Sequence, residues 1–101
     1  MIIFNITCHI EQSISQKFEI FYENLITKNQ FGESFFSEIT LLKLLTEIDD
    51  NTHTYSIQLK FEGMPYYQQF MVEKEDHLLA QLQNEFIGKI FTFTTLLQAI
   101  K

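Results

Sequence analysis

Hydrophobic residues change their spacing several times along this chain, and each change marks the start of a different element of secondary structure. Residues 1–10 alternate between an apolar and a mixed face, which predicts a strand. Its apolar positions are Ile2, Phe4, Ile6 and Cys8. After Ser13, which has the side chain of a helix N-cap, apolar residues at steps of three and four predict a helix that ends near Gly32. The predicted core face of this helix contains Ile14, Phe18, Phe21 and Leu25.

The segment Phe35–Ile48 has two interpretations from its pattern alone. The apolar run from Ile39 to Leu45 fits an amphipathic helix or a strand with two buried faces. Two neighbouring features favour the strand. A turn signal, Asp49-Asp50-Asn51, follows it, and the alternating segment Tyr55–Phe61 comes next. Two strands around a short polar turn form a β-hairpin.

A second helix and a last strand are predicted for the rest of the chain. The helix is expected to begin at Gly63-Met64-Pro65, because proline is favoured in the first turn, and to end at Gly88. Residues 89–100 alternate again and are rich in phenylalanine and threonine, which predicts a strand. The predicted core face of the helix contains Tyr67, Met71, Leu78, Leu82 and Phe86.

The predicted order is strand, helix, strand, strand, helix, strand, and it fills residues 1–101 as a single domain. This is the ferredoxin-like plan, an α+β fold in which a four-stranded antiparallel sheet of order 4-1-3-2 carries two helices on one face. The other face of the sheet has no helix to cover it. What covers that face is the main question about function.

The uncovered face is predicted to be polar at its centre and apolar at its edges. Candidate ligand-binding residues on the central strands are Asn5, Thr7, His9, Gln58 and Lys60. The edge strands are apolar on both faces, and candidate dimer contacts are Leu42, Leu44 and Leu96. Because an apolar edge strand promotes aggregation unless it is covered, we expect a second copy, related by twofold symmetry, to complete a dimeric α/β barrel. A monomer whose edge strand curls away is the alternative.

Charge and cysteine content restrict the partners and the compartment. With 7 basic and 13 acidic residues, the net charge is −6. Nucleic acids and anionic membranes bind basic surfaces, so neither is an expected partner. The N-terminus lacks the basic region of a signal peptide, and no apolar run approaches the roughly 20 residues of a membrane helix. The single Cys8 cannot form an internal disulfide, so we expect a soluble cytoplasmic protein.

Residue types that carry catalysis or bind metals do not form a recognisable motif. The three histidines, His9, His53 and His77, have no second ligand at the spacing of a metal site. Cys8 and His9 are neighbours in a strand, so they point to opposite faces and do not form a thiol–imidazole pair. The three glycines are isolated and make no phosphate-binding loop. We therefore assign no catalytic residue and expect no metal or cofactor.

Several segments, spread over the whole chain, resemble one known family. They are Ile2-Ile3-Phe4-Asn5-Ile6-Thr7, Thr54-Tyr55-Ser56-Ile57-Gln58, Tyr67-Gln68-Gln69-Phe70, Phe86-Ile87-Gly88-Lys89 and Phe93-Thr94-Thr95-Leu96-Leu97. In these segments the chain resembles the DUF4286 proteins, which are small uncharacterised proteins of Bacteroidetes-type bacteria. The resemblance implies a ferredoxin-like domain related to the dimeric α/β-barrel superfamily. It implies no activity.

Two classes of function stay open at this point. The first is a homodimeric binding or interaction module without catalysis of its own, favoured by the missing catalytic motif and the apolar edges. The second is a small-molecule-binding enzyme of the dimeric α/β-barrel type, such as a cofactor-independent monooxygenase or an isomerase, with His9 as a proton shuttle. A regulatory effector-sensing domain is less favoured, because the chain has no room for a DNA-binding helix-turn-helix. The sequence names no ligand, reaction or physiological partner.

Overall fold

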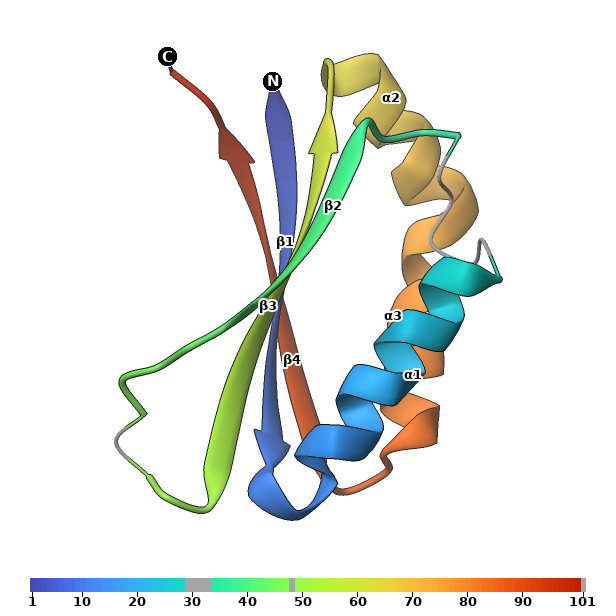
Figure 1. The fold of residues 1–101 in the computed structure, drawn as a ribbon. Helices are drawn as coiled ribbons and strands as arrows, with labels where there is room; N and C mark the ends of the chain where they lie inside the picture. Colours follow the sequence, from blue (N-terminus) through green and yellow to red (C-terminus); the bar gives the residue numbers. More distant parts are fainter. Residues whose placement is uncertain (29–33, 48, 101) are drawn as a thin grey trace.

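The computed structural model describes residues 1–28, 34–47 and 49–100, which form strands and helices in the predicted order. One antiparallel sheet has the strand order β2-β3-β1-β4, which is the predicted order 4-1-3-2 from its other end. The helices lie together on one side of this sheet, so the molecule has two layers (Figure 1). The strands and α-helices are β1 (Ile2–Glu11), α1 (Ser15–Thr27), β2 (Glu38–Lys43), β3 (Thr52–Phe61), α2 (Met64–Phe70), α3 (Asp76–Glu85) and β4 (Ile90–Gln98).

Alternation along the two central strands decides which side chains meet the helices. β1 and β3 pair over their whole length, from Ile2 opposite Phe61 to Glu11 opposite Thr52. The even-numbered residues of β1 from Ile2 to Ile10 are buried in the core, as the alternation predicts. The sheet contributes these residues to the core: Ile2, Phe4, Ile6, Cys8, Ile10, Tyr55, Ile57, Leu59, Phe61 and Ile90.

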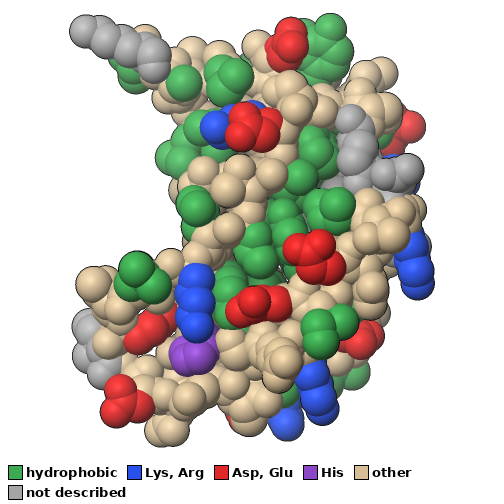
Figure 2. Space-filling model, in the orientation of Figure 1, with side chains coloured by type: hydrophobic (Ala, Val, Ile, Leu, Met, Phe, Trp, Pro, Cys, Tyr) green, Lys and Arg blue, Asp and Glu red, His purple; other side chains and the backbone are tan. Residues whose placement is uncertain are grey.

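Aromatic rings fill the space between the sheet and the helices. The ring of Phe61 lies 5.4 Å from that of Phe70 and 5.6 Å from that of Tyr67, and Phe4 packs against the same two rings. Tilted and edge-on contacts of this kind are the ones that aromatic quadrupoles favour. Figure 2 shows hydrophobic side chains gathered between β2 and α1, where the two layers meet at one edge of the sheet. Phenylalanine and tyrosine rings therefore form a substantial part of the core, together with isoleucine and leucine side chains.

The start of the first helix differs from the prediction. A 3-10 turn, Gln12–Ile14, follows β1 directly, and α1 begins at Ser15 without a capping side chain. Ser13 is not the N-cap, because the chain is still inside this tight turn, and its hydroxyl donates to the Glu11 carboxylate at 3.4 Å. The predicted end of the helix at Gly32 lies outside the described residues.

The second helical segment contains a π turn that changes its buried face. Met71–Glu75 forms this turn between α2 and α3. A π turn holds more residues than an α-helical turn, so it shifts the positions that follow around the helix axis. Met71 was predicted for the core face but is 42% exposed, whereas its neighbour Phe70 is fully buried. The predicted positions that are buried are Tyr67, Leu78, Leu82 and Phe86.

The ambiguous segment forms a strand, β2, which pairs with β3 as a hairpin. The strand prediction is confirmed, although β2 is only six residues long and Leu44 and Leu45 lie beyond it. The predicted turn is also confirmed. The Asp49 carboxylate accepts a hydrogen bond from the backbone N–H of Asn51 at 2.8 Å, which is an Asx turn. Ile48 lies outside the described residues.

The last connection, from α3 to β4, passes through Gly88. Its φ of 77° is the left-handed conformation that a glycine after a helix commonly takes. α3 itself ends at Glu85, three residues before Gly88. Within the part of the chain that the structure describes, no helix is long and apolar enough to span a membrane.

Candidate functional site: the open face of the sheet

The face of the sheet that carries no helix, which we call the open face, holds the odd-numbered residues of β1. Strand pairing places Asn5 between Gln58 of β3 and Thr95 of β4. In Figure 1 the open face is the side of the sheet turned away from the helices. By register it consists of Ile3, Asn5, Thr7, His9, Glu38, Thr40, Leu42, Thr54, Ser56, Gln58, Lys60, Phe91, Phe93, Thr95 and Leu97.

Asn5 lies at the centre of the open face and joins three strands. It is only 9% exposed. Its side-chain nitrogen donates to the hydroxyl of Thr7 at 3.0 Å and to that of Thr95 at 3.5 Å. Its side-chain oxygen accepts a hydrogen bond from the hydroxyl of Ser56. These four residues, which we call the polar cluster, therefore pair their donors and acceptors within the sheet.

His9 lies beside the polar cluster and is held by two other strands. Its Nδ1 is 2.9 Å from the hydroxyl of Thr54, and its ring meets Phe93 edge-on with 5.3 Å between the ring centroids. The preceding residue, Cys8, points into the core, where burial raises the pKa of its thiol to about 12. Because the thiol stays protonated on the opposite face, it does not act together with His9.

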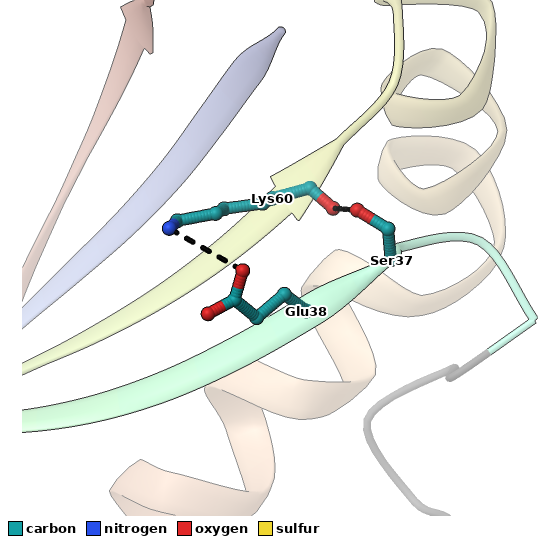
Figure 3. Close-up of polar contacts among 3 residues, drawn as sticks. All are labelled: Ser37, Glu38 and Lys60. Atoms are coloured by element: carbon teal, nitrogen blue, oxygen red, sulfur yellow. Dashed lines mark hydrogen bonds and ion pairs between the residues drawn. The ribbon is translucent and has the colours of Figure 1, made fainter.

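The other two predicted ligand residues lie on β3, nearer its C-terminal end. Lys60 forms an ion pair with Glu38 of β2, with 3.4 Å between Nζ and Oε2, while the hydroxyl of Ser37 donates to the Lys60 carbonyl oxygen at 3.1 Å (Figure 3). Such an exposed pair contributes about 0–1 kcal/mol to stability. The predicted residues thus share one face, and their role in binding stays a prediction: Asn5, Thr7, His9, Gln58 and Lys60.

Large apolar side chains border the polar cluster on both edge strands. On β4, Phe91, Phe93 and Leu97 are 60%, 48% and 44% exposed. The rings of Phe91 and Phe93 also contact each other, with centroids 4.9 Å apart. On the other edge, Leu42 and Leu44 are each 46% exposed, and the Leu44 amide still donates to the Thr54 carbonyl beyond the end of β2. We call these five residues the apolar margins.

The third predicted dimer contact, Leu96, lies on the other side of β4. Leu96 pairs with Phe4, whose ring packs against Phe70 of α2. Leu96 therefore belongs to the helix side of the sheet, where it is 43% exposed at the edge. A partner seated on the open face would contact Leu97 instead.

The predicted site residues do not include Phe91, Phe93, Thr95 and Leu97. Their alternation placed them on one face of a strand but did not say which face meets the helices. Only the register with β1, in which Thr95 pairs with Asn5, assigns them to the open face. Among residues 1–28, 34–47 and 49–100, no group of His, Cys, Asp and Glu side chains is arranged to hold a metal ion.

One family model matches nearly the whole chain. The match covers residues 1–100, and the family is described as a domain of unknown function, DUF4286. The chain belongs to the DUF4286 family. The resemblance inferred from the sequence is confirmed, and the family description states no activity. No curated protein matches this DUF4286 chain.

Two solved structures are similar to this DUF4286 protein in fold. One is a de novo designed protein with a ferredoxin fold, with a TM-score of 0.53 and 13% identity over 100% of this chain and 88% of that chain. The other is a Bacillus cereus protein named as an antibiotic biosynthesis monooxygenase, with a TM-score of 0.54 and 14% identity over 99% of this chain and 95% of that chain. At these identities the similarity shows the fold alone, which is ferredoxin-like as predicted.

Replacing the buried Asn5 with alanine is expected to destabilise this DUF4286 protein by about 1–3 kcal/mol, because the half-buried hydroxyl of Ser56 loses its acceptor. Urea unfolding followed by circular dichroism measures the change. Gln58→Ala is the matched control, since Gln58 pairs with Asn5 on the same face but makes no side-chain hydrogen bond to the described residues. Equal losses in the two variants would contradict a special role for Asn5.

Proposed function

We propose that this DUF4286 protein is a homodimeric binding module without catalysis of its own, in which two copies pack their open faces together. The single observation that carries the proposal is the combination, on one face, of apolar margins with a polar cluster that is already hydrogen-bonded. Exposed groups of large apolar side chains next to polar residues commonly mark protein–protein interaction sites. The face is therefore suited to burial against a partner.

A second copy is a suitable partner because the margins occur on both edges of the same face. A twofold axis brings the same surface of each copy together, so the margins of one copy can cover those of the other. Burying the polar cluster costs little, because its amide and hydroxyl groups already have partners within the sheet. Two sheets joined in this way form a dimeric α/β barrel.

The space between the two sheets is the proposed ligand site. Gln58 and Lys60 bring an amide and an ammonium group to it, and His9 brings an imidazole. Such a mixture of apolar walls and few polar groups is typical of small-molecule pockets. We expect a small polar ligand that accepts hydrogen bonds from these groups.

One observation favours an enzyme of the dimeric α/β-barrel type as the second candidate. His9 is fixed by Thr54 and Phe93, which leaves its other ring nitrogen to exchange a proton with a bound ligand. Examples of such an enzyme are a cofactor-independent monooxygenase and an isomerase. The similar Bacillus cereus protein carries a monooxygenase name, but at 14% identity that name stays its own.

Charge and cysteine content support a proposed compartment and argue against two kinds of partner. The net charge of −6 supports neither nucleic-acid nor anionic-membrane binding. The only cysteine, Cys8, is buried and free, which supports the reducing cytoplasm of a bacterium as the place of action.

Sedimentation of the purified protein at micromolar concentrations tests the proposal. We expect a mass of about 24 kDa, because each copy has a mass of 12.0 kDa. A single species of 12.0 kDa throughout this range would reject the homodimer. Native mass spectrometry of the same sample then distinguishes an empty dimer from a dimer that retains a small ligand. A retained ligand is the result expected for a binding module.

A further inference from the structure

A second group of polar side chains lies on the helix side of the sheet, near the start of α1. Ser15 and Glu19 are four residues apart on α1 and share a face of the helix. His53 and Tyr55 are two residues apart on β3 and share the helix side of the sheet. The His53 Nδ1 is 2.8 Å from the Ser15 hydroxyl, which is 2.7 Å from the Tyr55 hydroxyl. The Tyr55 hydroxyl in turn donates to the Glu19 carboxylate.

These four side chains, which we call the His53 chain, can pair their donors and acceptors in one direction only. The Glu19 carboxylate only accepts, so Tyr55 donates its single proton to it. Burial, reinforced by the hydrogen bond to Glu19, raises the pKa of Tyr55 to about 12, so the phenol keeps this proton. The Tyr55 oxygen then accepts from Ser15, and the Ser15 oxygen accepts from the Nδ1–H of His53.

The direction of the hydrogen bonds in the His53 chain determines which ring nitrogen of His53 has a free lone pair. When a neutral imidazole carries its proton on Nδ1, its lone pair lies on Nε2. His53 also lines a pocket of about 470 Å³ at the end of the sheet where β2 and β3 are joined. Other residues around this pocket are Gln12, Lys43, Leu44, Glu47 and Asp49.

We propose that His53 is the hydrogen-bond-accepting side chain of a small-molecule site in this pocket, fixed as the Nδ1–H tautomer by Ser15, Tyr55 and Glu19. The ligand is a small molecule that presents an N–H or O–H group to Nε2. Ser15 and Tyr55 are 9% and 2% exposed, so they are positioning residues that act through His53 and are shielded from the ligand.

The charges around the pocket indicate the class of ligand. The residues that line the pocket bring one ammonium, that of Lys43, and three carboxylates, those of Glu47, Asp49 and Asp50, which sums to 1 − 3 = −2 with His53 neutral. The Asp49 carboxylate is already engaged by the turn into β3. An anionic ligand is disfavoured in such a field, and a neutral or cationic hydrogen-bond donor is favoured.

Nitrogen-15 NMR of the intact protein, at a pH where imidazole is neutral, reads the tautomer of His53 directly. We expect the Nδ1–H form in the wild type. In Ser15→Ala we expect the Nε2–H form, which a neutral histidine side chain prefers in water, because Nδ1 has lost its acceptor. Ser13→Ala is the matched control, since this hydroxyl bonds only to Glu11 among the described residues, and His53 should keep its wild-type tautomer there.

A second variant keeps the test decisive if Ser15→Ala does not fold. In Tyr55→Phe the Ser15 hydroxyl loses the oxygen to which it donates and is free to donate to Nδ1, so the Nε2–H form of His53 should increase. An Nε2–H form in the wild type, or an unchanged tautomer in a folded variant of Ser15 or Tyr55, would overturn the proposal. A merely structural role for these residues would alter stability without moving the tautomer.

Acylation by diethyl pyrocarbonate tests whether Nε2 is open to small molecules. In this reaction the Nε2 lone pair attacks a carbonyl carbon of the reagent, monoethyl carbonate leaves, and the acylated ring releases its Nδ1 proton to water. We expect His53 in the folded wild type to react at a rate similar to that of His77, which is exposed on α3. Mass spectrometry of peptides identifies the modified histidines. A protected His53 beside a fully modified His77 would show a closed pocket and reject the site.

Discussion

Replacing Phe61 with alanine is expected to destabilise the protein by about 3–5 kcal/mol, the range observed when a buried phenylalanine is truncated. Phe61 is fully buried at the end of β3, where its ring contacts Phe36, Tyr67 and Phe70 with centroids 5.4 to 6.1 Å apart. Alanine would leave a cavity between the sheet and α2. Since domains of this size are stable by only about 5–15 kcal/mol, this loss is a substantial fraction of the whole free energy of unfolding.

Urea unfolding at a fixed protein concentration measures this loss, because a dimer would make the midpoint depend on concentration. Tyr66→Ala is the matched control. Tyr66 is an aromatic residue of α2, the helix against which Phe61 packs, but it is 50% exposed. Its truncation should therefore cost less than about 1 kcal/mol. A small loss for Phe61→Ala, similar to that of the control, would mean that the ring does not fill the core.

Replacing Phe93 with glutamate is expected to weaken the proposed homodimer by at least about 100-fold, which corresponds to roughly 2.7 kcal/mol. Phe93 lies in the apolar margins on β4, is 48% exposed, and contacts both His9 and Phe91. In a twofold dimer the substitution places two carboxylates in the interface, where each loses hydration without gaining a partner. Sedimentation should therefore detect a monomer at concentrations where the wild type is a dimer.

Val72→Glu is the matched control for this experiment. Val72 is 80% exposed and lies in the π turn on the helix side, away from the open face. The same change of charge there should leave the dimer intact. Circular dichroism of both variants checks that the fold is retained. If Phe93→Glu sediments as a folded dimer with the affinity of the wild type, the open face is not the interface.

Local spacing explains why much of the fold could be predicted. Alternation assigns the residues of β1 and β3 to two faces, because successive side chains of a strand point to opposite sides. The short polar turn at Asp49 identified the hairpin through the ability of its side chain to bond to the backbone. The π turn after Phe70 could not be predicted, because no residue type requires it, and Met71 was therefore placed on the wrong face.

The two candidate sites differ in how far the sequence could reveal them. The polar residues of the open face could be selected because they alternate with core residues on the same strands. The His53 chain was missed, although the spacings Ser15 to Glu19 and His53 to Tyr55 each place two polar groups on one face. Those pairs lie far apart along the chain, with Ser15 and Tyr55 separated by 40 residues, and nothing in either segment identifies the other.

The sequence by itself determined the order of the elements, the two faces of each central strand and the polar character of the open face, because these depend on spacing within one segment. The tertiary structure alone decided the rest. Pairing with β1 turned Leu97 to the open face and Leu96 to the helices, and the packing of α1 on β3 brought Ser15 to His53. Both outcomes depend on the register between distant segments, which a local pattern does not contain.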